Sequence, residues 1–291
     1  MLRLIGLIVL ATLASTPTEA APPLRVMSFN IRYGSAKDGE NSWNLRHDFV
    51  ADTIQSFDPD LFGTQETLGF QRDFLAAKFP GYTAIGVGRD DGGEKGEMMA
   101  IFIRKERFEI RESGHFWLSE TPDVAGSKSW DSSLPRMVTW VELKDKKAPD
   151  SPVLRWMNTH FDHIGVEARK QAARLIRERV QAAGDKAVLV TGDFNSIEGS
   201  DAYRNLFGAF EGRESPLIDT FRALPKDKQR FDDVATFSNF KGGGARKGGR
   251  IDWIGVTGQL RVLSSEIDYT ERNGRTPSDH FPVTAVIEWK P

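Results

Sequence analysis

The sequence contains no cysteine and only five histidines among its 291 residues. The absence of cysteine excludes a disulfide framework, a thiolate metal site and a cysteine nucleophile. With so few histidines, a zinc site built from three or four nitrogen or sulfur ligands is also a poor fit. A metal site in this chain would therefore draw mainly on oxygen ligands.

The chain also lacks a large charge of one sign, with a formal net charge of -2. A protein held to nucleic acid by bulk charge is therefore not expected, and a nucleic-acid substrate would have to be gripped locally. The pronounced apolar run at residues 4–14 follows Arg3 and precedes the small residues Ala20 and Ala21. It is too short to span a bilayer, so we predict a signal peptide over residues 1–21 and a secreted or periplasmic protein without stable membrane insertion.

Apolar stretches of strand length and amphipathic stretches of helical length alternate along the rest of the chain. Strands are predicted at residues 24–31, 61–63, 82–87, 98–103, 137–143, 153–158, 187–190, 251–256 and 283–289. Some alternate and others are continuously apolar, which indicates a mixture of half-covered and fully buried strands. Helices are predicted at residues 43–57, 68–79 and 165–183. The last is the clearest, because Ala168, Ala172, Ile176 and Val180 recur on one face.

Neither an internal repeat nor an interdomain linker is evident. The glycine-rich stretches at residues 86–96 and 241–249 read as loops, and polar motifs continue on both sides of each. We therefore predict a single α/β domain over residues 22–291, which we expect to be a monomer.

Short polar motifs lie at or beside the ends of the predicted strands. They are Ser-Phe-Asn-Ile-Arg (28–32), Gly-Thr-Gln-Glu-Thr (63–67), Asn-Thr-His (158–160), Thr-Gly-Asp-Phe-Asn (191–195), Arg-Ile-Asp-Trp-Ile (250–254) and Ser-Asp-His-Phe-Pro (278–282). This inventory suits hard-cation chemistry on a phosphate, with oxygen ligands for the ion and with amides and imidazoles for the phosphoryl oxygens.

Asp193 follows the most apolar of the predicted strands, at residues 187–190. A carboxylate at the carboxyl end of such a strand would be held rigidly and partly desolvated, which suits a general base or a group that orients water. Asn195 could hydrogen-bond a phosphoryl oxygen without adding negative charge. The alternative reading is an Asp/Asn turn at a strand exit, which is common.

The Asp279-His280 pair stands just before the last predicted strand. A carboxylate partner would hold the imidazole in one tautomer and keep it cationic near developing negative charge. Asp252 lies inside an apolar strand, where a carboxylate needs a partner, and His280 is a natural one. The alternative is a surface Asp-His pair without a functional role.

Glu66 ends one strand motif and Asn30 ends another. A hard cation could use the Glu66 carboxylate with Asn30 as its neutral companion, although each also reads as a cap or turn residue. His160 is followed by Asp162 and His163. This trio resembles a zinc site, but carboxylate-bound Mg²⁺ or Mn²⁺ fits the composition better, and the sequence assigns no role to Asp162 or His163.

Three arginines, Arg32, Arg89 and Arg136, could neutralise a phosphate, and Arg136 is best placed because it directly precedes a strand. For any single arginine, a solvated surface position is the competing interpretation. Trp43 and Trp130 stand in polar surroundings and are candidates to line a substrate cleft.

Taken together and in this order, the motifs FNIR, TQET, NTH, GDFN, RIDW and SDHFPV resemble the endonuclease/exonuclease/phosphatase superfamily, whose fold is that of deoxyribonuclease I. The resemblance covers nearly all of the chain from Asn30 to His280, and it is closest to a secreted bacterial branch related to deadenylase-type members. It implies a four-layer α/β/β/α sandwich of two packed mixed β-sheets flanked by helices.

The resemblance also implies roles for individual residues. Asn30 and Glu66 match the metal-side pair, and Asp279 lies near the metal. His160 matches the imidazole that contacts the phosphate, and Arg136 matches an arginine near it. Mg²⁺ is the implied cofactor, and Mn²⁺ could replace it.

The other matched residues belong to the attacking side of the reaction. Asp193 matches the residue that activates or orients the attacking water, and Asn195 matches the amide that holds the phosphoryl group. Asp252 matches the carboxylate that orients the final histidine, His280. The implied reaction is in-line attack of water on a phosphoester.

Several substrates and functions remain open at this stage. A phosphodiesterase or nuclease leads, and the alternative is a phosphatase or phospholipase C-like enzyme acting on small sugar, nucleotide or lipid phosphates. Outside this class, Glu66 and Asp193 could be the two carboxylates of a metal-independent glycosidase. A binding protein without catalytic activity is the third alternative.

Overall fold

Two six-stranded β-sheets form the framework of the computed structural model, which describes residues 21–209, 212–242 and 246–290. The first sheet has the order β11-β12-β1-β2-β4-β3 and the second has the order β5-β6-β7-β8-β10-β9. Both sheets are mixed, because β1–β2 and β7–β8 are parallel pairs among antiparallel ones. The strands are β1 Leu24–Asn30, β2 Leu61–Gln65, β3 Tyr82–Ile85, β4 Ile101–Arg104, β5 Phe108–Trp117, β6 Met137–Asp145, β7 Leu154–His160, β8 Ala187–Asp193, β9 Leu217–Asp219, β10 Asp252–Thr257, β11 Leu260–Ile267 and β12 Val283–Trp289.

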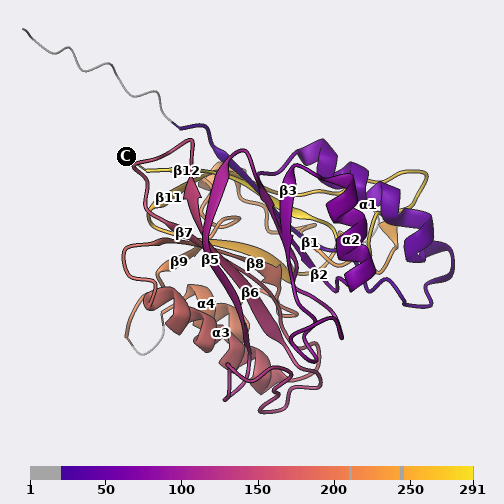
Figure 1. The fold of residues 1–291 in the computed structure, drawn as a ribbon, viewed down its shortest axis with the longest axis horizontal. Coiled ribbons are helices and arrows are strands. Elements are labelled where there is room, and N and C mark those ends of the chain that lie inside the picture. Colours follow the sequence, from indigo (N-terminus) through magenta and orange to yellow (C-terminus); the bar gives the residue numbers. More distant parts are fainter. Residues whose placement is uncertain (1–20, 210–211, 243–245, 291) are drawn as a thin grey trace, which may run out of the picture.

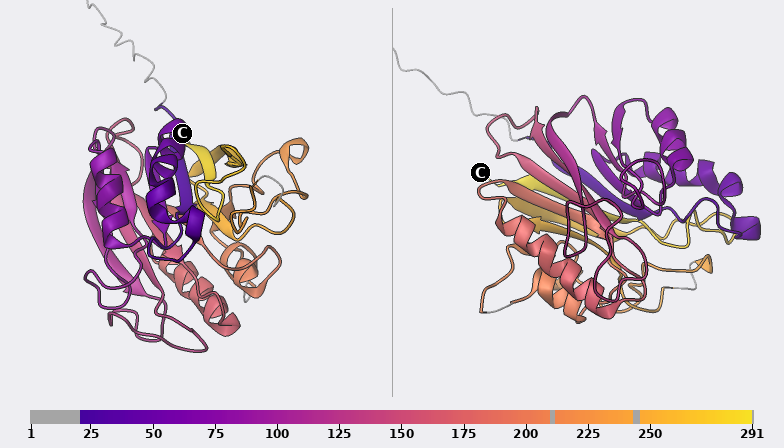
Figure 2. Two further views of the ribbon diagram at one scale, coloured as in Figure 1. Left: turned by 90° about the vertical axis from the view of Figure 1, so that its right-hand side faces the viewer. Right: turned by 60° about the horizontal axis from the view of Figure 1, so that its bottom comes forward.

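Helices cover the outer face of each sheet. The helices α1 (Trp43–Phe57) and α2 (Gly69–Lys78) pack on the first sheet, and α3 (Val166–Gln181) and α4 (Asp201–Phe207) pack on the second. The two pairs of helices lie on opposite sides of the strands (Figure 1 and Figure 2). The predicted four-layer α/β/β/α sandwich is therefore confirmed.

The layer between the two sheets is the main hydrophobic core. Leu24 and Leu61 of the first sheet pack with Trp156, Leu189 and Ile254 of the second, and all five are almost completely buried. Full burial of one such aliphatic side chain contributes about 1.5–3 kcal/mol. This packing fixes how the two sheets face each other, and so fixes the relative positions of their strand ends.

The strand register brings polar residues of distant segments into neighbouring positions. In the second sheet, Asp193 at the end of β8 is paired with His160 of β7 on one side and with Asp252 of β10 on the other. In the first sheet, β1 and β2 run parallel, so that Asn30 and Glu66 leave the sheet at the same edge. The polar motifs predicted at strand ends therefore meet at one end of the sandwich.

The elements that the sequence did not reveal are the strands β5, β9 and β11 and the helix α4. Each of the three strands lies at the edge of a sheet. An edge strand is partly covered and carries polar residues, as in Phe-Glu-Ile-Arg-Glu-Ser-Gly-His-Phe-Trp of β5, so its apolar pattern is weak. The helix α4 spans only seven residues, too few for a clear periodicity.

Two predictions concern membranes and processing. Residues 1–20, which hold nearly all of the predicted signal peptide, lie outside the described residues. Among the described residues, no helix has the length and apolarity needed to cross a bilayer.

Trp43 lies in the core and not in a substrate cleft. Its side chain is buried beneath α1 and packs edge-on against Phe74. The expectation that Trp43 lines a cleft was wrong because the polar residues around it belong to the first turn of an amphipathic helix. Trp130 is half-buried and is not one of the described residues that line the main pocket.

A glycine within β8 permits close approach of the neighbouring strand. An added Cβ at Gly192 would overlap the carbonyl oxygen of Thr159 in β7. We therefore expect Gly192→Ala to lower the free energy of unfolding by about 1–3 kcal/mol, because the strands must shift apart. Gly258→Ala is the matched control, since no atom of the described residues lies within 4 Å of its added Cβ. Equal urea midpoints for the two variants would contradict this account.

Candidate active site

The polar strand ends surround one pocket of about 420 Å³. Both sheets contribute to it, as do the loops that follow their strands. Its lining comprises Arg32, Tyr33, Glu66, Glu97, Leu134, Arg136, His160, His163, Asp193, Asn195, Phe237, Asn239, Ile251, Asp279 and His280. A pocket of this size suits a small ligand.

Asp193 lies at the centre of this pocket and is fully buried. Its Oδ1 accepts the backbone N–H of Asn195 at 2.9 Å, and its Oδ2 accepts the Nδ2–H of Asn30 at 2.9 Å. Burial and the neighbouring carboxylate of Asp252 raise the pKa of Asp193 to about 7. A carboxylate with this pKa can take up a proton near neutral pH.

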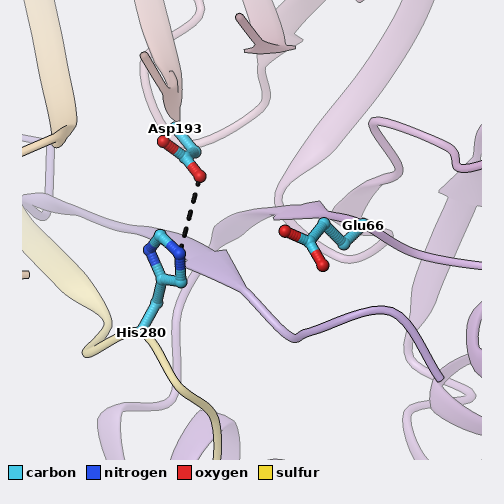
Figure 3. A group of neighbouring side chains, drawn as sticks. All are labelled: Glu66, Asp193 and His280. Carbon is cyan, nitrogen blue, oxygen red and sulfur yellow. Dashed lines mark ion pairs between the residues drawn. The ribbon is translucent and has the colours of Figure 1, made fainter. Parts of the chain in front are cut away.

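His280 and Asp193 both line the pocket, and their side chains point toward each other (Figure 3). Its Nδ1 lies 3.0 Å from Oδ2 of Asp252, and its Nε2 lies 3.7 Å from Oδ2 of Asp193. Burial disfavours the imidazolium, but the two carboxylates outweigh this and hold the pKa of His280 well above its ordinary value. The pairing of Asp252 with His280 that we expected from the sequence is present, and it leaves a cationic Nε2–H directed toward Asp193.

Glu66 completes a compact group with Asp193 and His280, in which one potential ligand atom of each lies within 4.8 Å of the others (Figure 3). Its Oε1 accepts from Asn30 and its Oε2 accepts the backbone N–H of Tyr33. Burial opposes ionisation, but the His280 cation and these two donors hold the pKa of Glu66 below its ordinary value. Glu66 is therefore a carboxylate at neutral pH.

Asn30 links the two carboxylates through its amide nitrogen. Its Nδ2 lies 3.0 Å from Glu66 and 2.9 Å from Asp193, while its Oδ1 accepts the backbone N–H of Arg32. Because a backbone N–H can only donate, this contact orients the amide with its nitrogen toward the carboxylates. The structure therefore gives Asn30 the position of a bridge beside the predicted metal ligands.

Asp279 lines the same pocket and is almost completely buried. Burial raises its pKa, and the Arg32 guanidinium lies 3.6 Å from its Oδ2. The oxygen-rich side of the pocket formed by Glu66, Asp193 and Asp279 has the donor chemistry that a hard divalent cation requires. His280 is a poor ligand while its ring is cationic, because a protonated Nε2 has no lone pair to offer a metal ion. These residues therefore fit Mg²⁺ or Mn²⁺ better than zinc.

His160 and Asn195 lie next to Asp193, with Nε2 of His160 at 3.4 Å from Oδ2 of Asp193. Nδ2 of Asn195 lies 3.0 Å from Nε2 of His160, and its second hydrogen bond goes to the carbonyl of Phe161. Burial and the cations of Arg136 and Arg89 hold the pKa of His160 well below its ordinary value. His160 is therefore a neutral imidazole, in contrast to His280.

The three arginines considered from the sequence have different surroundings. Arg32 lines the pocket, but its Nε and one terminal nitrogen bond Asp38 at 2.9 Å. Arg89 is buried and paired with Glu97 at 2.6 Å, and it is not one of the pocket-lining residues. Arg136 is buried and lines the pocket.

Sequence reasoning missed Glu97, Tyr33, Leu134, Phe237 and Asn239 as pocket residues. Glu97 directly precedes the apolar run at 98–103, where a carboxylate could have been noticed. The other four stand in loops without an apolar period, so nothing in their sequence surroundings marks them.

Comparison with known proteins extends these observations. The model of the endonuclease/exonuclease/phosphatase family matches residues 27–280. No curated protein sequence matches. Among solved structures, an endonuclease/exonuclease/phosphatase family protein of Bacteroides thetaiotaomicron is 35% identical with a TM-score of 0.83, covering 92% of this chain and 98% of that chain.

Two further solved structures have similar scores. An endonuclease/exonuclease/phosphatase of Bacteroides vulgatus is 37% identical with a TM-score of 0.82, covering 92% of this chain and 99% of that one. A protein of Bacteroides thetaiotaomicron named a mannosyl-6-phosphatase is 35% identical with a TM-score of 0.81, covering 91% of this chain and 100% of that one.

Proposed function

Since the chain belongs to the endonuclease/exonuclease/phosphatase family, we propose that it is a divalent-metal-dependent hydrolase of phosphoric esters, with Mg²⁺ as its cofactor and Mn²⁺ as a substitute. The observation that carries the proposal is the convergence of Glu66, Asp193 and His280 on one pocket. A glycosidase would need two carboxylates but neither the two buried histidines nor the bridging asparagine of this site.

The oxygen-rich side of the pocket is the proposed cation site. Glu66 and Asp279 would hold the ion, with Asn30 beside them orienting the Glu66 carboxylate through its amide nitrogen. When bound, a divalent cation neutralises negative charge on the phosphoryl oxygens.

Asp193 is the proposed general base. Its Oδ2 is positioned to accept a proton from the attacking water, since burial and Asp252 raise its pKa to about 7. Its other oxygen is tied to the backbone of Asn195, which restrains the carboxylate in one orientation. The water oxygen then forms a new bond to phosphorus as the bond from phosphorus to the ester oxygen breaks on the opposite side, and the leaving oxygen takes up a proton from solvent.

His280, His160 and Asn195 are the proposed stabilisers of the phosphoryl transition state. Asp252 keeps His280 cationic and directs its Nε2–H into the pocket. His160 and Asn195 present a neutral imidazole and an amide next to Asp193. Arg32 and Arg136 extend the positive lining around the substrate.

The preferred substrate is a small phosphorylated molecule, so we favour a phosphatase over the phosphodiesterase or nuclease that the sequence placed first. Two observations support this choice. The pocket volume of about 420 Å³ suits a small ligand, and a mannosyl-6-phosphatase is 35% identical over nearly the whole chain. A nuclease and an enzyme of lipid phosphates remain the competing candidates.

We also propose that the protein is secreted or periplasmic and acts as a monomer. The basic, apolar and small-residue regions of residues 1–21 support the first part. N-terminal sequencing of the exported protein should begin near residue 22, and an unprocessed cytoplasmic product would contradict it. Sedimentation of the purified protein would test the second part.

Chelation of metal ions tests the proposed function. We expect dialysis against EDTA to lower phosphoesterase activity at least about 100-fold, because charge neutralisation by the cation is lost. Added Mg²⁺ or Mn²⁺ should restore it. EDTA already saturated with Mg²⁺ is the control, and circular dichroism verifies that the chain stays folded. Full activity after chelation would exclude a metal-dependent mechanism and would favour a metal-independent hydrolase.

A further inference from the structure

Arg136 is a buried cation with one free end. Only 3% of the residue is exposed, and its side chain lines the main pocket. Its Nε lies 3.5 Å from Oδ2 of Asp162, and its Nη2 lies 2.9 Å from Nδ1 of His163. Its Nη1 is buried and has no hydrogen-bond partner among the described residues. A buried donor without a partner is costly, so this nitrogen is suited to an incoming acceptor.

Asp162 anchors Arg136 through Nε, which is not the nitrogen that lacks a partner within the described chain. Its Oδ2 also accepts the backbone N–H groups of Ser133 and Leu134, and its Oδ1 accepts that of Gly165. Asp162 therefore ties the loop before β6 to the loop after β7. Burial opposes ionisation, but the Ser133 hydroxyl, the backbone N–H groups of Gly165 and Ile164 and the Arg136 cation hold the pKa of Asp162 far below its ordinary value. The anchor is consequently a carboxylate at every working pH.

His163 adds a second donor next to Arg136. A guanidinium can only donate, so Nδ1 of His163 must accept and its proton must lie on Nε2. His163 is exposed and lines the pocket. Both residues line the same pocket as His160, and burial together with the Arg136 cation lowers the pKa of His160, which places the pair near that imidazole. This part of the pocket thus offers two hydrogen-bond donors, Nη1–H of Arg136 and Nε2–H of His163.

The chemistry of phosphate esters indicates what these two donors bind. A phosphodiester has two non-bridging oxygens, whereas a phosphomonoester has a third and carries a second negative charge above pH of about 6. The Nε2–H of His280 and the cation side already provide partners for two oxygens in the proposed mechanism. A fixed guanidinium with a free N–H is a strong partner for another charged oxygen.

We propose that Arg136 and His163 bind the third terminal oxygen of a phosphomonoester and thereby select monoesters over diesters. Asp162 is the positioning residue that holds Arg136 in place. This proposal rests on the proposed function, because it assumes that the protein hydrolyses phosphoric esters. It gives Asp162 and His163, for which the sequence indicated no role, a place in substrate selection.

Ligand binding tests this proposal without relying on turnover. In the presence of Mg²⁺ at pH 8, calorimetry would compare inorganic phosphate, dimethyl phosphate and inorganic pyrophosphate on wild type, Arg136→Met and His163→Ala. We expect each variant to bind inorganic phosphate about 10- to 100-fold more weakly, as for a lost hydrogen bond to a charged group, with dimethyl phosphate affinity unchanged. Arg261→Met and His115→Ala are the matched controls, since both lie outside the pocket.

Kinetics with two esters of the same leaving group supply the second readout. Wild type should hydrolyse 4-nitrophenyl phosphate in preference to bis(4-nitrophenyl) phosphate, and both variants should lose monoester kcat/KM selectively. If Arg136→Met fails to fold, His163→Ala decides the outcome, because His163 is exposed.

Three results would overturn the proposal. If His163→Ala binds phosphate as tightly as wild type, His163 does not bind the third oxygen. If a variant loses equal affinity for phosphate and for dimethyl phosphate, the substituted residue does not distinguish the two ligands by the third oxygen. If the variants lose affinity for pyrophosphate alone, the two donors bind a second phosphate group of the ligand and not the third oxygen of the first. If wild type hydrolyses neither ester with Mg²⁺ or Mn²⁺, the proposed function fails instead, and the phosphate affinities still decide whether the binding site exists.

Discussion

Asp193→Asn is expected to lower kcat by about 10²- to 10⁴-fold, which is the usual contribution of a positioned general base. Asparagine has nearly the same shape and can still accept the backbone N–H of Asn195, but it cannot take a proton from water. The change also removes one of the buried carboxylates that crowd Asp252. We therefore expect the thermal midpoint to stay the same or to rise.

The measurement is steady-state kinetics at saturating Mg²⁺, together with thermal unfolding followed by circular dichroism. Asp150→Asn is the matched control, because this aspartate is exposed in the loop between β6 and β7. A variant Asp193→Asn that is folded and retains wild-type kcat would refute the role of Asp193 as the base. Loss of both folding and activity would call for the milder Asp193→Glu.

His280→Asn is expected to lower kcat by about 10²- to 10³-fold, as for the removal of one donor that stabilises a transition-state oxyanion. The asparagine amide can occupy the position of Nδ1 and keep a hydrogen bond to Asp252. It has no counterpart of Nε2, which in the native site lies 3.7 Å from Asp193. The cationic donor on the reacting side is therefore lost while the buried partner of Asp252 is retained.

The experiment compares kcat and KM of His280→Asn with those of His115→Asn. His115 lies on the edge strand β5, outside the pocket, and its Nδ1 lies 3.2 Å from Oγ1 of Thr139. A fall in kcat with little change in KM would agree with an interaction made in the transition state. A large rise in KM at unchanged kcat would instead make His280 a residue of ground-state binding.

Much of the fold could be predicted because its interior strands are strongly apolar. β8 and β10 are buried along their whole length, and both appear in the sequence as apolar runs. The helix α1 coincides with the predicted residues 43–57. The edge strand β11 could not be predicted, because its alternate residues face solvent and its serines break the apolar pattern.

The residues of the candidate site were predictable to a similar degree. Glu66, Asp193 and His280 stand in motifs at strand ends, and the structure gathers them within one pocket. Glu97 was missed because it reaches the pocket from a loop whose path depends on hydrogen bonds to Arg89 and its neighbours. Loop paths of this kind have no period in the sequence from which they could be inferred.

The chemical inventory, the apolar strands and the polar residues at strand ends follow from the sequence by itself. Side-chain chemistry and the two-residue period of a strand are local properties, so a single chain displays them directly. Tertiary structure alone decided that the amide nitrogen of Asn30 bridges Glu66 and Asp193, and that Arg136 is anchored with one free donor. These contacts join segments far apart in the chain, and their distances depend on strand register and on how the two sheets pack.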